Sequence, residues 1–493
     1  MKCLSTFALV AGLLSTSDAL YLQRRTEGVA PRVVGFPVQR KPVANPLLRD
    51  RLRRRASTVQ ASLQNEVCIA NANVSTISDW QQETLYFANG TLGTPAQSLK
   101  LHLDTGSSDL WVNTPTSALC KSKGSPCAST GTYTANSSST YSYIASDFNI
   151  SYVDGSGASG DYVSDTFSIG GTKLDKLQFG IGYTSSSSEG ILGIGYQINE
   201  VQVGRAGKAA YNNLPAQLVA DGTIQSSAFS LWLNDLDAST GSILFGGIDT
   251  EKYTGTLATL PIQQESGVYA EFLITLTEVS LGGMVIAANQ AQAVLLDSGS
   301  SLTYLPDAMT EAIYEQVSAQ YSSVDGAAFV PCSLASNTST LDFTFSSPTI
   351  SITMDELVLP ATSADGRPLV ESDGTKVCLF GIAPAGSTTA VLGDTFIRSA
   401  YLVYDLSNNE ISIAQTKFNT TATNVVEITT GSSAVPDATA VANPVAASAG
   451  TGSNNVASGL GTSTSKAAAQ RTAAPVHFGA LAAVGAGIFY AAM

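Results

Sequence analysis

The sequence contains very little histidine and cysteine. Only two of its 493 residues are histidines, His102 and His477, and the six cysteines include no Cys-x-x-Cys pair. Triad hydrolases need a histidine base, and zinc sites are built from clusters of His and Cys. The sequence therefore argues against both kinds of site. Any hydrolytic chemistry must come from carboxylates, Ser, Lys or Tyr.

Charged side chains are also scarce. They make up 13% of the residues, against 44% that are apolar, and Ser, Thr and Gly are abundant among the rest. This mixture is typical of extracellular all-β proteins, in which short strands alternate with many turns. Because 493 residues are too many for one small core, we expect two lobes and additional tails.

The charge is unevenly distributed along the chain. Between Leu20 and Arg55 there are ten basic and two acidic residues, and this segment ends in the run Arg51-Leu-Arg-Arg-Arg55. The whole chain carries −14, so the remainder is strongly acidic and should repel nucleic acid. We interpret residues 20–55 as a basic pro-segment that binds the acidic body and is removed near Arg55. A solvated basic tail is the alternative.

The N-terminus is typical of a signal peptide over residues 1–19. Lys2 precedes the apolar run Phe7–Leu14, and Ser17 and Ala19 are small residues at the cleavage positions. A buried N-terminal helix is the alternative. We therefore expect the chain to enter the secretory pathway and to reach the extracellular face of the cell.

The C-terminus resembles a lipid-attachment signal. Residues 420–465 are rich in Ser, Thr, Ala, Gly and Asn and predict a flexible stalk. Residues 466–493 end in an apolar run that begins at Phe478 and is shorter than the ~20 residues of a membrane-spanning helix. A small-residue region, a spacer and an apolar end predict a GPI anchor attached near Gly461–Ser465, at the plasma membrane or cell wall. A true membrane span or an adhesive apolar tail is the alternative.

Secretion makes disulfides and N-glycans plausible. Cys120 and Cys127 lie close together in the sequence, as do Cys332 and Cys378, and each pair could close a surface loop, which leaves Cys68 without an assigned partner. Glycosylation sequons occur at Asn73, Asn89, Asn136, Asn149, Asn337 and Asn419.

Two segments repeat one pattern, in which an apolar strand is followed by Asp, a hydroxyl residue, Gly and a second hydroxyl residue. The first contains Asp104-Thr105-Gly106-Ser107, and the second contains Asp297-Ser298-Gly299-Ser300. An apolar strand that ends in Asp places a carboxylate where ionisation is costly. The following hydroxyls can orient that carboxylate, and Gly allows close approach of backbone N–H donors. One such segment would be an ordinary turn, but the repeat about one lobe apart is specific.

These residues resemble the pepsin-like aspartic proteases, and among them the fungal GPI-anchored and secreted kind, the yapsins and candidapepsins. The resemblance covers roughly Glu83 to Ala414. Beyond the two Asp motifs, the matching segments are Tyr86–Gln97, the flap hairpin Ile150-Ser-Tyr152-Val-Asp154-Gly155-Ser, Gly190–Tyr196, Phe245–Asp249 and Ala390–Phe396. One departure is Val153, where the flap usually has Gly.

The resemblance implies an all-β fold with two β-rich lobes, residues 56–261 and 262–419, and an extended cleft between them. It implies an aspartic endopeptidase in which Asp104 and Asp297 share a proton and activate a water, without metal or cofactor. The substrates would be peptides and proteins, and the enzyme would be a monomer. The two cysteine pairs fall where the family has its disulfides.

The resemblance also assigns roles around the two Asp residues. Ser107 and Ser300 would orient the carboxylates. Tyr152, in the flap with Asp154 and Gly155, would close over the substrate, and Trp111 would support it through its indole N–H; ordinary aromatic packing is the alternative. Asp154 is a hypothetical acceptor for a basic substrate side chain or, equally, a turn residue.

The pro-segment would inhibit by placing a basic residue on the dyad, and acidification would release it, so we expect activity at acidic pH. Two other functions stay open from the sequence. One is an anchored, inactive binding protein, and the other is a glycosidase that uses the two carboxylates.

Overall fold

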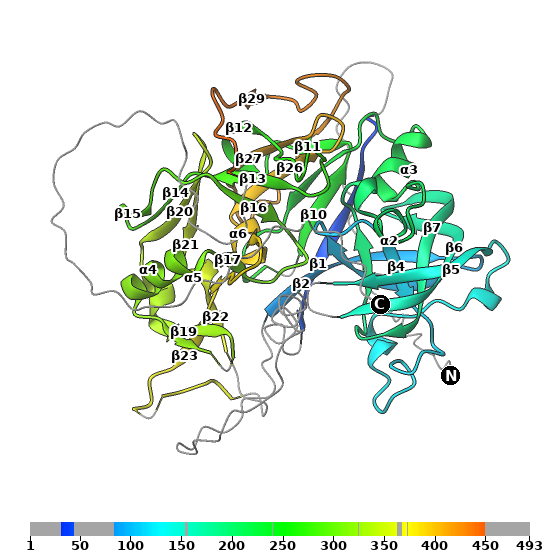
Figure 1. Cartoon of the computed structure of the whole chain (residues 1–493), viewed down its shortest axis with the longest axis horizontal. Helices are drawn as coiled ribbons and strands as arrows, with labels where there is room; N and C mark the ends of the chain where they lie inside the picture. Colours follow the sequence, from blue (N-terminus) through cyan, green and yellow to red (C-terminus); the bar gives the residue numbers. More distant parts are fainter. Residues whose placement is uncertain are drawn as a thin grey trace, which may run out of the picture.

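The computed structural model describes residues 31–43, 83–152, 156–238, 240–323, 325–361, 367–371 and 373–448 (Figure 1). The predicted signal peptide, most of the predicted pro-segment, the predicted anchor signal, Cys68, Asn73, Asp154 and Gly155 lie outside these residues.

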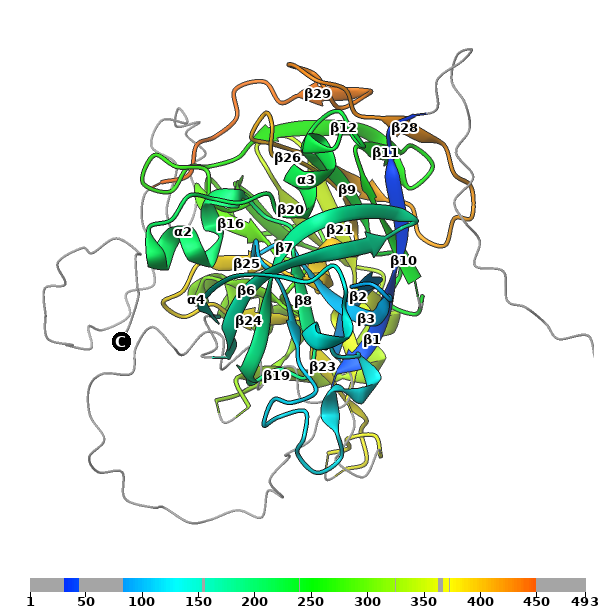
Figure 2. The ribbon, with the colours of Figure 1, turned by 90° about the vertical axis from the view of Figure 1, so that its right-hand side faces the viewer.

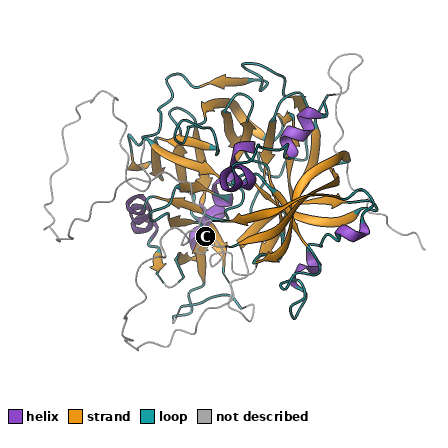
Figure 3. Ribbon diagram, turned by 45° about the vertical axis from the view of Figure 1, so that its right-hand side comes forward, coloured by secondary structure: helices purple, strands orange, loops and turns teal. Residues whose placement is uncertain are grey.

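Strands dominate the described chain, which confirms the predicted all-β class (Figure 3). The strands of the first half are β1 (Val34–Val43), β2 (Glu83–Leu92), β3 (Gln97–Asp104), β4 (Leu110–Asn113), β5 (Ser142–Ser151), β6 (Gly157–Ile169), β7 (Thr172–Ser185), β8 (Gly190–Gly193), β9 (Ala228–Trp232), β10 (Thr240–Phe245), β11 (Gly247–Asp249) and β12 (Tyr253–Pro261).

The second half continues the strand-rich pattern with shorter strands. They are β13 (Leu273–Leu276), β14 (Glu278–Leu281), β15 (Met284–Ala287), β16 (Gln292–Leu296), β17 (Thr303–Leu305), β18 (Gln320–Ser322), β19 (Ala327–Pro331), β20 (Thr340–Thr344), β21 (Thr349–Thr353), β22 (Val358–Pro360), β23 (Val377–Phe380), β24 (Ile382–Pro384), β25 (Ala390–Leu392), β26 (Ala400–Asp405), β27 (Glu410–Thr416), β28 (Val425–Glu427) and β29 (Ala438–Ala440).

The helices are short and lie around the sheets. They are α2 (Val201–Ala206), α3 (Leu214–Ala220), α4 (Asp307–Val317), α5 (Met354–Leu357) and α6 (Asp394–Ile397), with 3-10 turns at Pro126–Ser129, Ala135–Ser137, Gln197–Asn199 and Cys332–Ser336. Among the described residues, no helix combines the length and apolar character needed to cross a membrane.

The two halves repeat one strand topology. In the first half β3 pairs in parallel with β8, β8 antiparallel with β4, and β4 in parallel with β7. In the second half β16, β25, β17 and β24 pair in the same order and directions. Figure 1 shows the first half (cyan and green) on the right and the second (green to yellow) on the left. This arrangement supports the predicted bilobal pepsin-like fold and brings Asp104 and Asp297 to equivalent positions, since each ends or follows the first strand of its set.

An apolar core runs without interruption between the halves. The Phe229 ring from β9 stacks on Tyr404 from β26 with centroids 4.8 Å apart, and Phe272, just before β13, meets Tyr404 edge-on at 4.7 Å. All three side chains are completely buried. Burial of such large aromatic side chains stabilises the junction on which the two Asp-bearing strands rest.

Residues 34–43 of the predicted pro-segment form a central strand of the body. β1 pairs antiparallel with β10 through Val34–Gln39 and with β2 through Val38–Val43, and Figure 2 shows it beside β2 and β10. The side chains of Val34, Phe36 and Val38 are buried in the main core. Backbone pairing and apolar burial therefore hold this part of the segment, in addition to the charge attraction expected from its composition.

The predicted flexible stalk is wrong for residues 420–448. β28 pairs with β11, β29 pairs in parallel with β12, and the side chains of Ile428, Ala434 and Val435 are buried. The Lys252 ammonium donates hydrogen bonds to the backbone carbonyls of Thr420 and Ala422, at 3.0 and 2.9 Å. A few well-spaced apolar residues and backbone pairing suffice to dock this segment, although its average composition is polar.

The structure contains both predicted disulfides. Cys120 and Cys127 are joined with their Cα atoms 5.2 Å apart, and Cys332 and Cys378 with theirs 5.0 Å apart. Both separations lie in the ordinary range for disulfides. The first closes a loop on the first half, and the second joins the 3-10 turn Cys332–Ser336 to β23.

Docking of the 420–448 segment can be tested by truncating its central apolar side chain. Ile428→Ala should lower the free energy of unfolding by about 2–5 kcal/mol, because it removes a completely buried side chain and leaves a cavity. Urea denaturation measures this, with Val285→Ala as control, since Val285 is 54% exposed and should change stability by less than about 0.5 kcal/mol. Equal stability of both variants would contradict the docking.

Candidate active site

The two aspartates have matching hydrogen-bond partners. Gly106 N and Ser107 Oγ donate to the two carboxylate oxygens of Asp104, at 2.9 and 2.5 Å. Gly299 N and Ser300 Oγ donate to those of Asp297, at 2.8 and 2.7 Å. Each carboxylate is thus oriented by one backbone N–H and one hydroxyl two and three residues further on.

The glycines let the two carboxylates approach each other. A Cβ atom added to Gly299 would lie 2.5 Å from Asp104 Oδ1 and 2.9 Å from Asp297 Oδ1. A Cβ atom added to Gly106 would lie 2.6 Å from Asp297 Oδ1. Because real Cβ atoms do not come so close to other atoms, only glycine fits at either position. The two Oδ1 atoms therefore face one small space between the lobes.

Thr105 and Ser298 fasten the two loops to each other. Thr105 Oγ1 donates to the Leu296 carbonyl at 2.9 Å and accepts from Ser298 N at 2.9 Å. Ser298 Oγ donates to the Leu103 carbonyl at 3.0 Å and accepts from Thr105 N at 3.2 Å. All four bonds are buried, where they fix geometry most strongly. The pattern is reciprocal, so neither aspartate can shift without disturbing the other.

Two apolar segments run behind the aspartate loops. Ile194 N donates to the Asp104 carbonyl at 3.1 Å, and Asp297 N donates to the Leu392 carbonyl at 3.1 Å. Gly193 lies so close to the first loop that an added Cβ would be 2.6 Å from Asp109 N. The segments Gly190–Tyr196 and Ala390–Phe396, which carried the family resemblance, therefore support the two loops from behind.

Tyr152 and Trp111 are in direct contact. The Trp111 indole N–H donates to the Tyr152 hydroxyl at 2.7 Å, and the Trp111 side chain is completely buried. Tyr152 lies at the end of β5, and β5 pairs with β6 in a long hairpin. This hydrogen bond is the contact expected of Trp111, and its role in supporting a substrate-binding Tyr152 stays a prediction. Asp154 and Gly155, at the tip, lie outside the described residues.

A pair of buried acids behind Trp111 was missed by the sequence analysis. Asp109 accepts hydrogen bonds from the Tyr162 and Tyr211 hydroxyls, at 2.8 and 2.9 Å, and from Val201 N at 2.9 Å. Glu200 is 1% exposed and accepts from Tyr211 N at 2.8 Å. Burial raises the pKa of Glu200 to about 9, with a smaller contribution from the neighbouring Asp109 charge. Asp109 belongs to the first Asp motif, but nothing in the sequence marks Glu200.

A third carboxyl near the dyad was also missed. Leu296 N donates to the Phe272 carbonyl, which continues the β13–β16 pairing and places Glu271 across from Asp297. Burial, together with the charges of Glu265 and Asp297, raises the pKa of Glu271 to about 8. In acid Glu271 is therefore a neutral neighbour of the dyad. Only the strand register identifies it.

The five sequon asparagines within the described residues are all exposed. They are Asn89 on β2, Asn136 in the turn Ala135–Ser137, Asn149 on β5, Asn337 after the turn Cys332–Ser336, and Asn419 after β27. None lies among the residues that contact the two aspartates.

The buried acid pair should make the protein less stable as the pH rises. The unfolded chain ionises Glu200 above its ordinary pKa of 4.5, whereas the folded chain keeps it protonated to about 9. The folded state therefore binds more protons between these values, and the free energy of unfolding falls as the pH rises through them. Glu200→Gln has no proton to lose at this position. Its Tm should therefore fall over this pH range by at least about 2 °C less than the Tm of the wild type.

Thermal unfolding from pH 4.5 to 8 measures this, with Glu315→Gln, on the exposed face of α4, as control. Parallel pH curves for wild type and Glu200→Gln would contradict the assignment of Glu200.

The comparisons with known proteins agree with this geometry. Residues 85–416 match the family model described as eukaryotic aspartyl protease. A protein named probable aspartic-type endopeptidase opsB, from Aspergillus oryzae, is 55% identical over 89% of this chain and 86% of its own length. Its namesake from Arthroderma benhamiae is 49% identical over 99% of this chain and 98% of its own, and secreted aspartic protease 3 from Candida albicans is 36% identical over 71% and 83%. The chain belongs to the eukaryotic aspartyl protease family and is an aspartic-type endopeptidase.

Proposed function

We propose that Asp104 and Asp297 together activate one water molecule that hydrolyses a peptide bond. The observation that carries this proposal is that both Oδ1 atoms face one space between the lobes, across Gly106 and Gly299. Two carboxyls so close together cannot both ionise easily, so they hold one proton between them. One acts as a base while the other acts as an acid, and neither role is assigned to Asp104 or to Asp297 individually.

The proposed reaction has two steps. The ionised carboxylate takes a proton from the water as its oxygen attacks the scissile carbonyl carbon, and the protonated carboxyl stabilises the developing oxyanion. Transfer of that carboxyl's proton to the oxyanion gives a tetrahedral diol. The diol then collapses: the C–N bond breaks, the carboxyl that took the water proton passes it to the leaving nitrogen, and a diol hydroxyl returns its proton to the other carboxyl, so that the pair again holds one proton. The products are a carboxylic acid and an amine, and no acyl-enzyme forms. Ser107 and Ser300 keep the carboxylates oriented throughout.

The flap supplies the other wall of the proposed substrate cleft. The Trp111 indole N–H fixes the Tyr152 hydroxyl, so the ring has a defined position next to the turn of the hairpin β5–β6. An extended peptide would bind below it, largely through backbone hydrogen bonds. Asp154 remains a candidate partner for a basic substrate side chain, for which cleavage-site profiling of Asp154→Asn is the test.

The dyad can be tested with isosteric variants. Asp104→Asn and Asp297→Asn should each lower kcat/KM on a denatured protein at about pH 4 by about 10²-fold to 10⁴-fold or more, because the shared proton and the base are lost. A statine-type peptide, which mimics the diol, should inhibit the wild type. Asp237→Asn, at an exposed position, is the control. Full activity in either dyad variant would refute the mechanism.

We also infer that the chain is made as a zymogen. The basic segment 20–55 contains β1, which occupies the middle of the large sheet between β10 and β2. A cut near Arg55 would leave β1 held by backbone pairing and by the burial of Val34, Phe36 and Val38. Acid then weakens only the attraction between basic residues and carboxylates.

Processing should therefore separate into two observable events. At neutral pH, a precursor cut near Arg55 should retain the 20–55 peptide through gel filtration, as detected by mass spectrometry. At about pH 4 more of the peptide should dissociate as activity appears, because carboxylates lose their charge and only backbone pairing and apolar burial still hold the segment. Phe36→Asp, which puts a charge in the core, should release the peptide at neutral pH. Full activity with the peptide still bound would contradict its inhibitory role.

We further propose secretion, N-glycosylation and GPI attachment at the cell surface. The signal-like N-terminus, the exposed sequons and the apolar C-terminal run support this, and one similar protein is named a secreted aspartic protease. Because docking extends to residue 448, the tether between body and anchor would be shorter than the composition suggested.

The anchor has a direct biochemical test. Phosphatidylinositol-specific phospholipase C should release the active enzyme from cell membranes, and a chain ending at Ser465 should appear in the medium, because it lacks the apolar run that directs lipid attachment. The same chain with the apolar run restored is the control. Retention in membranes after the phospholipase treatment would argue for a membrane span or for adhesion of the tail.

A further inference from the structure

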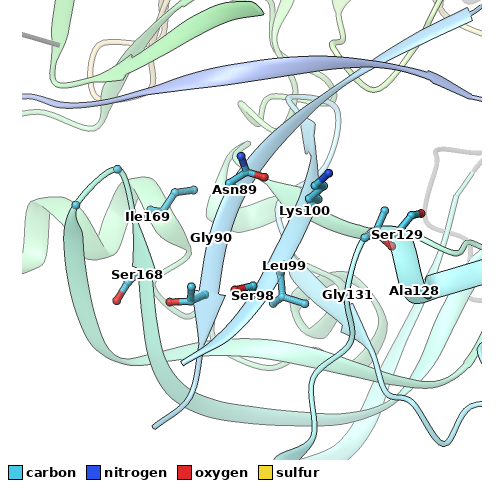
Figure 4. A pocket seen from close by; sticks show the side chains of 14 residues that line it. Asn89, Gly90, Ser98, Leu99, Lys100, Ala128, Ser129, Gly131, Ser168 and Ile169 are labelled. Atoms are coloured by element: carbon cyan, nitrogen blue, oxygen red, sulfur yellow. The ribbon is translucent and has the colours of Figure 1, made fainter. Parts of the chain in front are cut away.

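A groove of about 550 Å³ opens on the first half of the molecule, away from the two aspartates. Its floor is the outer face of β2 and β3, and Figure 4 shows Asn89 and Lys100 side by side there. One wall is the segment 128–131, which follows the Cys120–Cys127 loop, and the other is the β6–β7 turn around Gly170 and Gly171. A groove of this size accommodates a small ligand.

The floor is polar because of the strand register. Asn89 pairs with Lys100, and Thr91 pairs with Ser98 on β3 and with Ser168 on β6. Residues two apart on a strand share a face, so these five side chains lie on the same side of the sheet. Gly90 and Leu99, between them on the two strands, are buried but also line the groove, as do Ala128 and Ile169, so apolar groups lie beside the polar ones. Polar side chains on the floor suit a ligand rich in hydroxyl groups.

The wall formed by residues 128–131 is held by backbone contacts. Lys100 N donates to the Thr130 carbonyl at 2.8 Å, and Gly131 N donates to the Cys127 carbonyl at 2.9 Å. Gly131 has a φ of +87°, which a side chain would strain, and an added Cβ would collide with the Ser98 carbonyl. The first wall therefore stays close against the floor, and the groove is a feature of the folded chain.

The sequon Asn89-Gly90-Thr91 identifies an occupant. Asn89 is exposed, lines the groove and carries the amide to which an N-glycan is joined. Of the five described sequon asparagines, only Asn89 is among the lining residues of this groove. We propose that an N-linked glycan on Asn89 lies with its first sugars in this groove, between the 128–131 segment and the β6–β7 turn. The inference rests on the proposed glycosylation, not on the catalytic mechanism.

The docked sugars would have partners of suitable chemistry. Hydroxyl groups and acetamido groups of a glycan accept hydrogen bonds from an ammonium such as Lys100 and exchange them with the hydroxyls of Ser98 and Ser129. The glycan would also bridge the disulfide loop to the β6–β7 hairpin. It would thus stabilise an edge of the half that carries Asp104 and the flap.

Enzymatic deglycosylation of the folded protein tests this inference. The full chain, secreted from a glycosylating host, is treated with a peptide N-glycosidase in ¹⁸O water, and each sequon is read by mass spectrometry. If the Asn89 glycan occupies the groove nine-tenths of the time, its release from native protein should be about tenfold slower than that of the Asn337 glycan. In denatured protein the two rates should be equal.

Two variants separate the groove from other causes of slow release. Ala128→Tyr fills the groove at an exposed wall residue and should bring the native release rate at Asn89 close to that at Asn337. Asn89→Gln should lower the Tm more than Asn337→Gln, because only the first loses a bridging glycan.

Three results would overturn the inference. They are an unmodified Asn89 in a chain that is glycosylated at Asn337, equal native release rates at the two sites, and slow release that persists in Ala128→Tyr. These measurements do not involve peptide cleavage, so their outcome is independent of the dyad experiments.

Discussion

The reciprocal hydrogen bonds between Thr105 and Ser298 are the constraint on which the rest of the site depends. Each side chain accepts a hydrogen bond from the other residue's backbone N–H, and each hydroxyl donates to a carbonyl across the interface. Apolar packing between the lobes is non-directional and by itself would leave small shifts of one loop against the other less restricted. Four directional bonds in a buried setting prevent this, and such precision is what shared use of one water demands.

The glycines and the hydroxyl residues of the two loops have different structural roles. Gly106 and Gly299 permit the carboxylates to approach, while Ser107 and Ser300 fix how each carboxylate is turned. Behind the first loop, Asp109 accepts hydrogen bonds from two tyrosines, and the raised pKa of Glu200 keeps it protonated. One lobe thus contains Asp104, proposed to react, and two acids that serve the packing. The proposed dyad would use its carboxyls for chemistry, whereas the buried pair uses them for structure. The second use makes a folded state that favours acid, the range in which the proposed chemistry works.

The sequence was sufficient to predict residues that lie in a repeated motif. It was not sufficient to predict residues whose environment is formed by segments distant in the chain. Asp104 and Asp297 were identifiable because one pattern occurs twice. The two disulfides were identifiable because each pair of cysteines could close a loop and falls where the resembled family has its disulfides. Glu200 and Glu271 carry no local signal, since their environment arises from a distant tyrosine loop and from strand register. The strand β1 was overlooked for a different reason. Its alternating Val34, Phe36 and Val38 were present, but the surrounding arginines dominated the interpretation.

Strands from both ends of the described chain belong to the same large sheet, so the proposed processing would affect stability. The sheet runs from β29 at one edge through β12, β27, β26, β9 and β10 to β1, and then on to β2 and β3, which carries Asp104. Loss of β1 would leave β10 and β2 with unpaired backbone groups in the middle of the molecule, and exposed strand edges pair with whatever is available. Removal of the basic segment therefore requires that another strand take its place. The residues between 43 and 83 join β1 to β2, so the chain that follows a cut near Arg55 is the nearest source of such a strand.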